Sequence, residues 1–265
     1  MNRKKIVLLT VVLLLVFSFS HTAFASPFFE RNYKQINTNP VTILMYHMFS
    51  ENPEEWSTYC TSPQVLENDI IYLKSQGYEF LTANELATEY IPNPYKKVVL
   101  LTLDDGYESD YQYVLPLLEK YGVKATFFVT GSHIGLDRYL TKEMLLSLSQ
   151  SPYAEIGNHS YLNHSNSYEK IQEMLETQPE IYAKDFLTNR AFLESIIKKP
   201  VTSLSYPNGL YNRSVNAMVL MQGHRITLST DLQRFVYGAG DIPFGRINRP
   251  HNAEISELMK IQFHD

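Results

Sequence analysis

Short apolar runs alternate along this chain with longer stretches in which apolar residues recur every three or four positions. The runs predict strands at 41–46, 79–81, 98–103, 125–129, 154–157, 202–206, 225–229 and 245–247. The periodic stretches predict helices at 62–76, 83–90, 111–121, 141–149, within 168–196, at 214–221 and at 253–262. Alternating strands and helices form βαβ units and a parallel sheet. About seven such units in one domain predict an α/β fold, specifically a distorted (β/α) barrel. No glycine-rich phosphate loop follows the first strand, which disfavours a dinucleotide-binding fold.

The first 40 residues have a different character. Arg3, Lys4 and Lys5 precede an apolar stretch over 6–19, and Ala23-Phe24-Ala25 has the small-x-small pattern of a cleavage site. We therefore predict a signal peptide at 1–25, a polar leader at 26–40 and a catalytic domain at 41–265. The stretch is short for a membrane span, which needs roughly 17 to 25 apolar residues; an uncleaved anchor is the alternative. Either way, we expect a secreted or cell-surface protein.

Composition narrows the classes of partner. The chain carries a formal net charge of −5 and has no basic run after the predicted signal, which argues against nucleic acid as a partner. Cys60 is the only cysteine, so no intramolecular disulfide can form, and its thiol is either buried or free. The 19 tyrosines suit a groove for sugars, because each ring offers an apolar face with a polar edge. We expect a monomer.

Two adjacent carboxylates follow the apolar run at 98–103. Asp104, Asp105 and Gly106 stand where a buried strand is expected to end, and buried carboxylates are costly unless a cation faces them. Adjacent strand side chains point to opposite faces, so a shared site needs a break that Gly106 can supply. The pair would have a function if one carboxylate bound a metal ion and the other accepted a proton. The alternative is a polar turn, because Asp-Gly is a common turn dipeptide.

Two histidines, His159 and His164, follow the expected strand at 154–157 with a spacing of five. On a regular helix this spacing turns the side chains about 140° apart, so they can converge only from a loop. Two histidines and one carboxylate leave open positions for water and substrate, as catalytic zinc requires. An incidental surface pair is the alternative. Together with the Asp-Asp-Gly segment, the pair indicates a metal site.

The candidate residues share one position in the expected fold. Active sites of barrels lie at the carboxyl ends of the strands, and the polar residues at such ends are His47, Asp104, Asp105, His159, His164 and Tyr206. This coincidence predicts one site built from several strands.

These segments resemble the polysaccharide deacetylases with a NodB-homology domain, carbohydrate esterase family 4. The resemblance covers roughly residues 41–265 and implies a NodB-like fold. The segment at 101–107, Leu-Thr-Leu-Asp-Asp-Gly-Tyr, resembles the first motif of the family, and His159 begins a segment similar to the second. The family commonly spaces its two histidines four apart. The spacing of five, together with Leu44-Met45-Tyr46-His47 and the segment at 72–78, resembles the branch that deacetylates poly-β-1,6-N-acetylglucosamine, a biofilm adhesin.

The resemblance implies a role for each candidate residue. Asp104 would be the general base, and Asp105, His159 and His164 would hold one divalent ion, expected to be Zn²⁺. Tyr206 and a backbone N–H near Asn208 would contact substrate or its oxyanion. His47 is the preferred general acid and His251 the second candidate, with a structural or surface histidine as the alternative for each. The other histidines, His21, His133, His224 and His264, are expected to be structural or at the surface.

One motif departs from the family pattern. The third motif usually reads Arg-x-Pro-Tyr, whereas the segment at 205–209 here reads Ser-Tyr-Pro-Asn-Gly. The arginine normally supports the base, so Asp104 needs another partner. The poly-N-acetylglucosamine branch tolerates this loss, which weakens an assignment to peptidoglycan.

The function implied by the resemblance is hydrolysis of N-acetyl groups on an N-acetylglucosamine polymer, with the poly-β-1,6-linked polymer of biofilm matrix favoured. A peptidoglycan or chitooligosaccharide deacetylase is the alternative enzyme. An inactive carbohydrate-binding surface protein is the alternative of another class, although binding alone does not need all four of Asp104, Asp105, His159 and His164.

Overall fold

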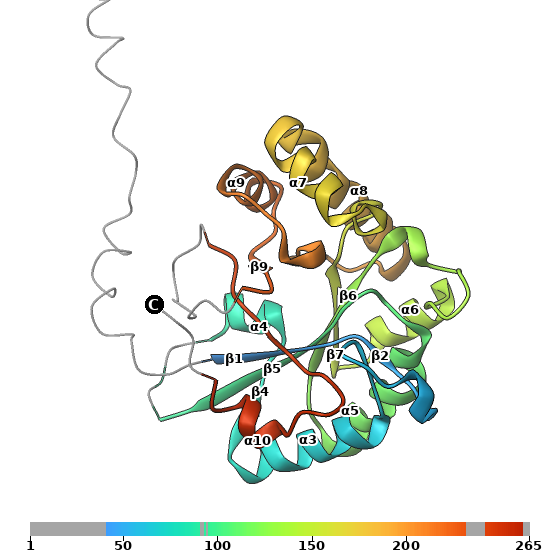
Figure 1. Ribbon diagram of the computed structural model, residues 1–265, viewed down its shortest axis with the longest axis vertical. Helices are drawn as coiled ribbons and strands as arrows, with labels where there is room; N and C mark the ends of the chain where they lie inside the picture. Colours follow the sequence, from blue (N-terminus) through green and yellow to red (C-terminus); the bar gives the residue numbers. More distant parts are fainter. Residues whose placement is uncertain (1–40, 91–92, 94, 232–241, 262–265) are drawn as a thin grey trace, which may run out of the picture. The chain divides into compact units, whose positions relative to one another are not determined.

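The computed structural model describes residues 41–90, 93, 95–231 and 242–261. The predicted signal peptide and leader lie outside these ranges. Within them, parallel strands form one curled sheet in the order β10-β1-β5-β6-β7-β8-β9, and β4 pairs with the first half of β5 (Figure 1). The strands of this sheet are β1 (Val41–Tyr46), β4 (Tyr78–Phe80), β5 (Lys97–Leu103), β6 (Ala125–Val129), β7 (Ala154–Asn158), β8 (Ser203–Ser205), β9 (Ile226–Leu228) and β10 (Ile247–Asn248). The predicted parallel α/β barrel is confirmed.

Helices connect successive strands of this sheet. The α-helices are α3 (Pro63–Ser75), α4 (Ala83–Thr88), α5 (Leu115–Tyr121), α6 (Lys142–Gln150), α7 (Tyr168–Thr177), α8 (Pro179–Ile197), α9 (Arg213–Met221) and α10 (Ile255–Leu258). In Figure 1, α3 and α5 lie together below the sheet and α7, α8 and α9 lie together above it. Among the described residues, no helix is long and apolar enough to cross a membrane.

The two ends of the curled sheet are joined by one short segment. Phe244 forms a parallel bridge with Leu228 of β9, and three residues later Ile247 pairs with Leu44 of β1. The segment at 244–248 therefore contacts both ends of the strand path. Residues 245 and 246 lie between these two contacts, so a side chain there can reach the space that the curled sheet encloses.

Alternating side chains of each strand build two different cores. Ile43, Val98, Leu100 and Phe128 pack inside the curl, whereas the alternate residues such as Leu101 pack outward against the helices. A strand covered on both faces reads as a continuous apolar run, which is why β1 and β5 are evident in the sequence. The same alternation continues along β5, so residues 102 and 104 point inward.

Some elements differ from the prediction. The helix expected at 111–121 begins as a π-helix, Asp110–Val114, before α5. The last helix, expected at 253–262, is α-helical only over Ile255–Leu258 in the described part of the chain. A separate two-stranded sheet of β2 (Met48–Phe49) and β3 (Cys60–Thr61) was not predicted. Cys60 lies in β3 and is buried, and burial raises the pKa of its thiol.

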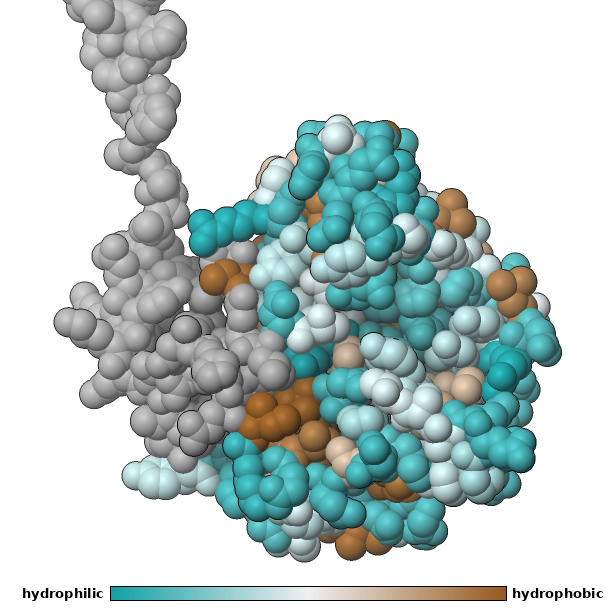
Figure 2. All heavy atoms as spheres, in the orientation of Figure 1, coloured by the Kyte–Doolittle hydropathy of each residue, from teal (hydrophilic) through white to brown (hydrophobic). Residues whose placement is uncertain are grey.

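The face drawn in Figure 2 is mostly hydrophilic, with apolar residues gathered in a few areas. A polar surface over apolar layers is the ordinary arrangement of a folded domain in water. The polar surface therefore needs no functional explanation, whereas the polar residues inside the curled sheet do.

Candidate metal centre and catalytic pocket

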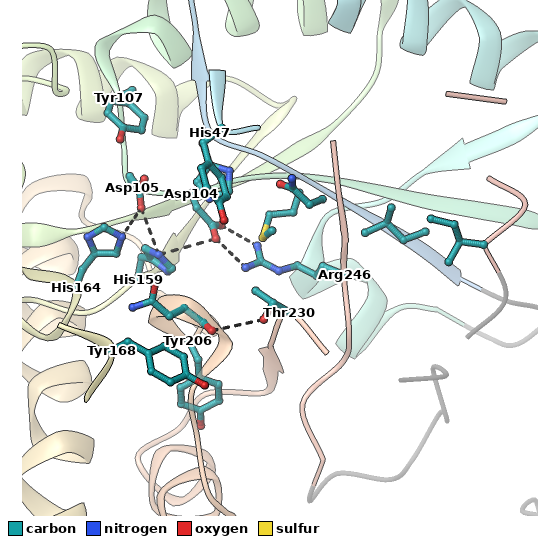
Figure 3. A pocket seen from close by; sticks show the side chains of 16 residues that line it. His47, Asp104, Asp105, Tyr107, His159, His164, Tyr168, Tyr206, Thr230 and Arg246 are labelled. Carbon is teal, nitrogen blue, oxygen red and sulfur yellow. Dashed lines mark hydrogen bonds and ion pairs between the residues drawn. The ribbon is translucent and has the colours of Figure 1, made fainter. Parts of the chain in front are cut away.

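A cavity of about 700 Å³ opens at the carboxyl ends of the strands. Seven predicted site residues line it, as do nine residues that the sequence analysis did not assign to the site. The predicted ones are His47, Asp104, Asp105, His159, His164, Tyr206 and Asn208, and the others are Met45, Tyr59, Tyr107, Tyr168, Thr230, Arg246, Ile247, Asn248 and Ile261. The structure therefore brings together the residues expected at one site (Figure 3).

The two carboxylates reach the same pocket because the backbone turns sharply after β5. Asp104 continues the inward alternation of the strand. Asp105 and Gly106 then have φ values of 78° and 81°, a left-handed conformation that aspartate tolerates and glycine adopts freely. A Cβ on Gly106 would lie 3.0 Å from Cγ1 of Val129. The predicted break is present, and Asp105 itself shares it with Gly106.

His159 follows β7 with its ring orientation fixed by the next strand. Its Nδ1 lies 2.9 Å from the carbonyl oxygen of Ser205, to which it donates a hydrogen bond. This contact leaves the lone pair of Nε2 free, which is how protein histidines are held for metal binding. Nε2 lies 3.4 Å from Oδ1 of Asp105 and 3.8 Å from Oδ2 of Asp104.

His164 reaches the same carboxylate from a short 3₁₀ helix, Asn163–Ser165. Its Nε2 lies 2.8 Å from Oδ1 of Asp105, and its backbone N–H donates to Oγ of Ser160 at 3.1 Å. The two histidines thus converge from a loop, as their spacing predicted.

The three predicted ligands form a group suited to a divalent ion. One ligand atom from each of Asp105, His159 and His164 lies within 4.8 Å of the others. In the described part of the chain, no backbone amide or hydroxyl donates to the buried Oδ1 of Asp105. Burial alone would raise the pKa of this carboxyl, but the two histidines hold it well below its ordinary value. Two imidazole nitrogens and one charged oxygen are donors that zinc accepts, so these residues fit the expected metal.

Asp104 has a partner that the sequence analysis missed. Arg246 donates from both terminal nitrogens to Asp104, at 2.7 Å to Oδ1 and 2.7 Å to Oδ2. Arg246 also donates to Oγ of Ser205 at 2.7 Å and to the carbonyl oxygen of Ser229 at 3.1 Å. Burial would raise the pKa of Asp104, but the Arg246 guanidinium, together with His159 and His47, keeps this pKa below its ordinary value. Arg246 therefore supplies the support expected from the missing arginine of the third motif.

A signal for Arg246 was present in the sequence. It stands inside the short strand predicted at 245–247, where a lone arginine between Gly245 and Ile247 needs a buried acidic partner. The local sequence pattern did not indicate that Asp104 is the acidic partner of Arg246. The segment at 244–248 contacts both ends of the sheet. This position places the Arg246 guanidinium within hydrogen-bonding distance of Asp104.

The two candidate acids occupy different surroundings. His47 lines the pocket, and its ring meets the Tyr59 ring edge-on with centroids 4.8 Å apart. Burial lowers the pKa of His47, and the charges of Asp104 and Asp105 offset part of this effect. His251 instead stacks on Trp56 with ring centroids 4.1 Å apart, and its Nδ1 lies 3.1 Å from Oγ1 of Thr61. It is not among the described residues that line the pocket, so the geometry favours His47.

The remaining predicted site residues contribute differently. The hydroxyl of Tyr206 donates to Oδ1 of Asn216 at 2.9 Å, and its buried ring packs beside Phe186. The polar end of Tyr206 is therefore directed away from the reacting groups. Asn208 is exposed, has φ 55° and lines the pocket.

Four histidines were expected to have no catalytic role. His224 is buried, and its Nδ1 lies 3.0 Å from the carbonyl oxygen of Val219. His133 lies beside the site, with its ring 5.6 Å from that of His164 and 4.5 Å from that of Tyr139, but it does not belong to the ligand group. His21 and His264 lie outside the described residues.

Comparisons with known proteins identify one family of similar sequences. The family model described as "Polysaccharide deacetylase" matches residues 92–226. The Bacillus subtilis protein YxkH is 28% identical over 191 residues, which are 71% of this chain and 64% of that protein. The poly-β-1,6-N-acetyl-D-glucosamine N-deacetylase of Staphylococcus aureus is 24% identical over 205 residues, covering 75% of this chain and 71% of that enzyme.

The fold is also similar to a solved structure, the Streptococcus pyogenes deacetylase PplD in complex with acetate. The TM-score is 0.70 at 23% identity, covering 84% of this chain and 98% of PplD. At this identity the likeness concerns the fold. The chain spans less than two thirds of the length of YxkH.

Proposed function

The chain belongs to the polysaccharide deacetylase family, and from this premise we propose that it hydrolyses N-acetyl groups on an N-acetylglucosamine polymer. One observation carries the proposal: Asp105, His159 and His164 converge beside the arginine-bound Asp104 in a single pocket. Carbohydrate binding alone does not require a ligand group and a supported carboxylate side by side. This argues against an inactive binding protein.

The proposed cofactor is one divalent ion, Zn²⁺, held by Asp105, His159 and His164. When bound, such an ion lowers the pKa of water and polarises an acetamide carbonyl. The residues around it have separate tasks. Asp104, kept ionised by Arg246, would accept the proton of the attacking water. A backbone N–H near Asn208 would donate to the oxyanion.

The leaving amine needs a proton, and His47 is the proposed donor. Because burial lowers its pKa, His47 is neutral in the resting pocket at neutral pH. His47 would therefore take up from solvent the proton that it delivers to the amine, and the proton that Asp104 accepts would return to solvent. His251 is the second candidate.

The favoured substrate is poly-β-1,6-N-acetylglucosamine. The named activity of the Staphylococcus aureus relative and the five-residue histidine spacing support this choice. The exposed rings of Tyr59 and Tyr168 at the pocket offer apolar faces on which sugars can stack. Peptidoglycan and chitooligosaccharides are the alternative substrates.

Defined oligomers test this proposal. The purified protein, loaded with Zn²⁺, is incubated with β-1,6-linked and β-1,4-linked N-acetylglucosamine oligomers, and released acetate is measured. Acetate from the β-1,6-linked oligomer supports the favoured substrate, and acetate only from the β-1,4-linked one supports the alternative enzyme. Binding of oligomers without any acetate would mean that the protein is a carbohydrate-binding protein.

We also propose that the protein is exported through the predicted signal peptide at 1–25, which the apolar stretch and the small-x-small site support. Cell fractionation combined with N-terminal sequencing tests this. Recovery of the intact chain in the cytoplasm would contradict it.

Changing His159 to alanine is expected to remove most bound metal, because a ligand atom whose orientation Ser205 fixes is lost. Metal analysis of the purified variant measures this, with His251→Ala as a control that removes a histidine outside the pocket, where its ring stacks on Trp56. Full occupancy in His159→Ala would remove this residue from the proposed site.

Changing His47 to alanine is expected to lower turnover strongly on an acetamide but much less on an activated acetate ester, whose leaving group needs no proton. Parallel assays on both substrates measure the difference, and His251→Ala is the control. Equal losses on both substrates with a lowered melting temperature would indicate a structural His47 and move the acid to His251 or to water.

A further inference from the structure

One face of α8 holds the segment that carries both histidines. The contacts come from four residues of the helix, Tyr182, Asp185, Phe186 and Asn189. Their spacing of three, four and seven places them along one stripe of an α-helix. Asp185 and Asn189 contribute side-chain groups to these contacts, and Tyr182 and Phe186 contribute their backbone carbonyl oxygens.

Several of these hydrogen bonds converge on the carboxylate of Asp185. Its carboxylate accepts the backbone N–H groups of three consecutive residues, Tyr161 at 2.8 Å, Leu162 at 3.0 Å and Asn163 at 3.3 Å. Successive N–H groups directed at one anion form a concave binding site for negative charge. Hydrogen bonds to an ionised acceptor are about twice as strong as neutral ones. The three residues lie between His159 and His164.

Other contacts of the stripe fix the start and the end of the same segment. The side-chain amide of Asn189 donates to Oδ1 of Asn158 at 2.8 Å, directly before His159. The side-chain amide of Asn158 donates to the carbonyl oxygen of Phe186 at 2.7 Å. At the other end, the side-chain amide of Asn163 donates to the carbonyl oxygen of Tyr182 at 3.0 Å. Between these two ends, Asp185 is the α8 residue whose carboxylate accepts backbone N–H groups of the segment. The backbone N–H groups of Gly131 and Ser132 also donate to the segment, to the carbonyl oxygens of Ser160 at 3.1 Å and Tyr161 at 3.2 Å.

We propose that Asp185 is a positioning residue for the metal centre and holds the loop that makes His159 and His164 converge. The five-residue spacing gives no convergence on a regular helix, so the loop needs an anchor from another part of the fold. Asp185 provides it through the backbone, without touching either imidazole. This inference rests on the proposed metal-dependent function.

The test is the affinity for Zn²⁺ of three variants, measured by competition with a chromophoric chelator. We expect Asp185→Ala to bind Zn²⁺ about 10- to 100-fold more weakly, the usual effect of losing a residue that supports metal ligands. Asp185→Asn keeps one acceptor oxygen and should show a smaller loss. Glu194→Ala is the matched control, because Glu194 is also a carboxylate of α8 that accepts a loop N–H, from Val201 at 2.9 Å. Its affinity should equal that of the wild type.

Amide hydrogen exchange in the metal-free protein gives a second readout. Exchange at 161–163 should be faster in Asp185→Ala than in the wild type and unchanged in Glu194→Ala. A folded Asp185→Ala with wild-type affinity and exchange would overturn the inference; if that variant does not fold, the same two measurements on Asp185→Asn decide. Wild-type protein that binds no Zn²⁺ would instead overturn the metal site of the proposed function, and this inference with it.

Discussion

Replacing Asp104 with asparagine is expected to lower deacetylation by about 10²-fold or more while the metal content stays near that of the wild type. Asparagine keeps the shape of the side chain but cannot accept the proton of the attacking water. The proposed ligands Asp105, His159 and His164 remain in place. Acetate release and metal analysis on the same preparation measure the two effects.

A matched control separates loss of the base from loss of a buried charge. Glu155 is also an acidic residue of the sheet, where it accepts hydrogen bonds from Ser203 at 2.6 Å and Thr126 at 3.0 Å, but it does not line the pocket. Glu155→Gln should therefore retain activity at temperatures where it is folded. Near-normal turnover of Asp104→Asn would place the base elsewhere.

Replacing Arg246 with leucine is expected to lower the free energy of unfolding by about 3–5 kcal/mol at neutral pH, the usual cost of removing one partner of a buried ion pair. Neither side chain is more than 3% exposed, so water cannot replace the guanidinium. The loss should shrink in acid, because protonation of Asp104 then leaves no unpaired charge in the variant. Urea unfolding of chelator-treated protein at neutral and acidic pH measures this.

A double-mutant cycle with Asp104→Asn tests whether the effect arises from this pair. The double variant should be less destabilised than the sum of the two single variants, since neither charge is then left alone. Additive losses would mean that Arg246 stabilises the protein mainly through its other contacts, with Thr102, Ser205 and Ser229.

The sequence by itself predicted the order of strands and helices in the main sheet and the three candidate metal ligands that the structure brings together. The buried strands read as apolar runs because both faces of a parallel sheet are covered, and this pattern is local. Asp104 and Asp105 follow such a run, and His159 follows the next but one predicted strand, so a parallel arrangement was enough to predict that they meet. The spacing of His159 and His164 also excluded a helix between them without any knowledge of the fold.

Tertiary structure alone decided what supports these residues. Arg246 is 142 positions from Asp104, and their contact exists only because the segment at 244–248 joins the two ends of the curled sheet. Asp185 reaches the loop between the histidines only because α8 packs against it. In both contacts a charged side chain binds groups that are distant in sequence. A local sequence pattern does not show which distant groups the fold brings next to that side chain. The candidate site residues could therefore be predicted from the sequence. The ion pair that supports Asp104 and the backbone contacts that hold the histidine loop depend on how the sheet closes and where α8 packs.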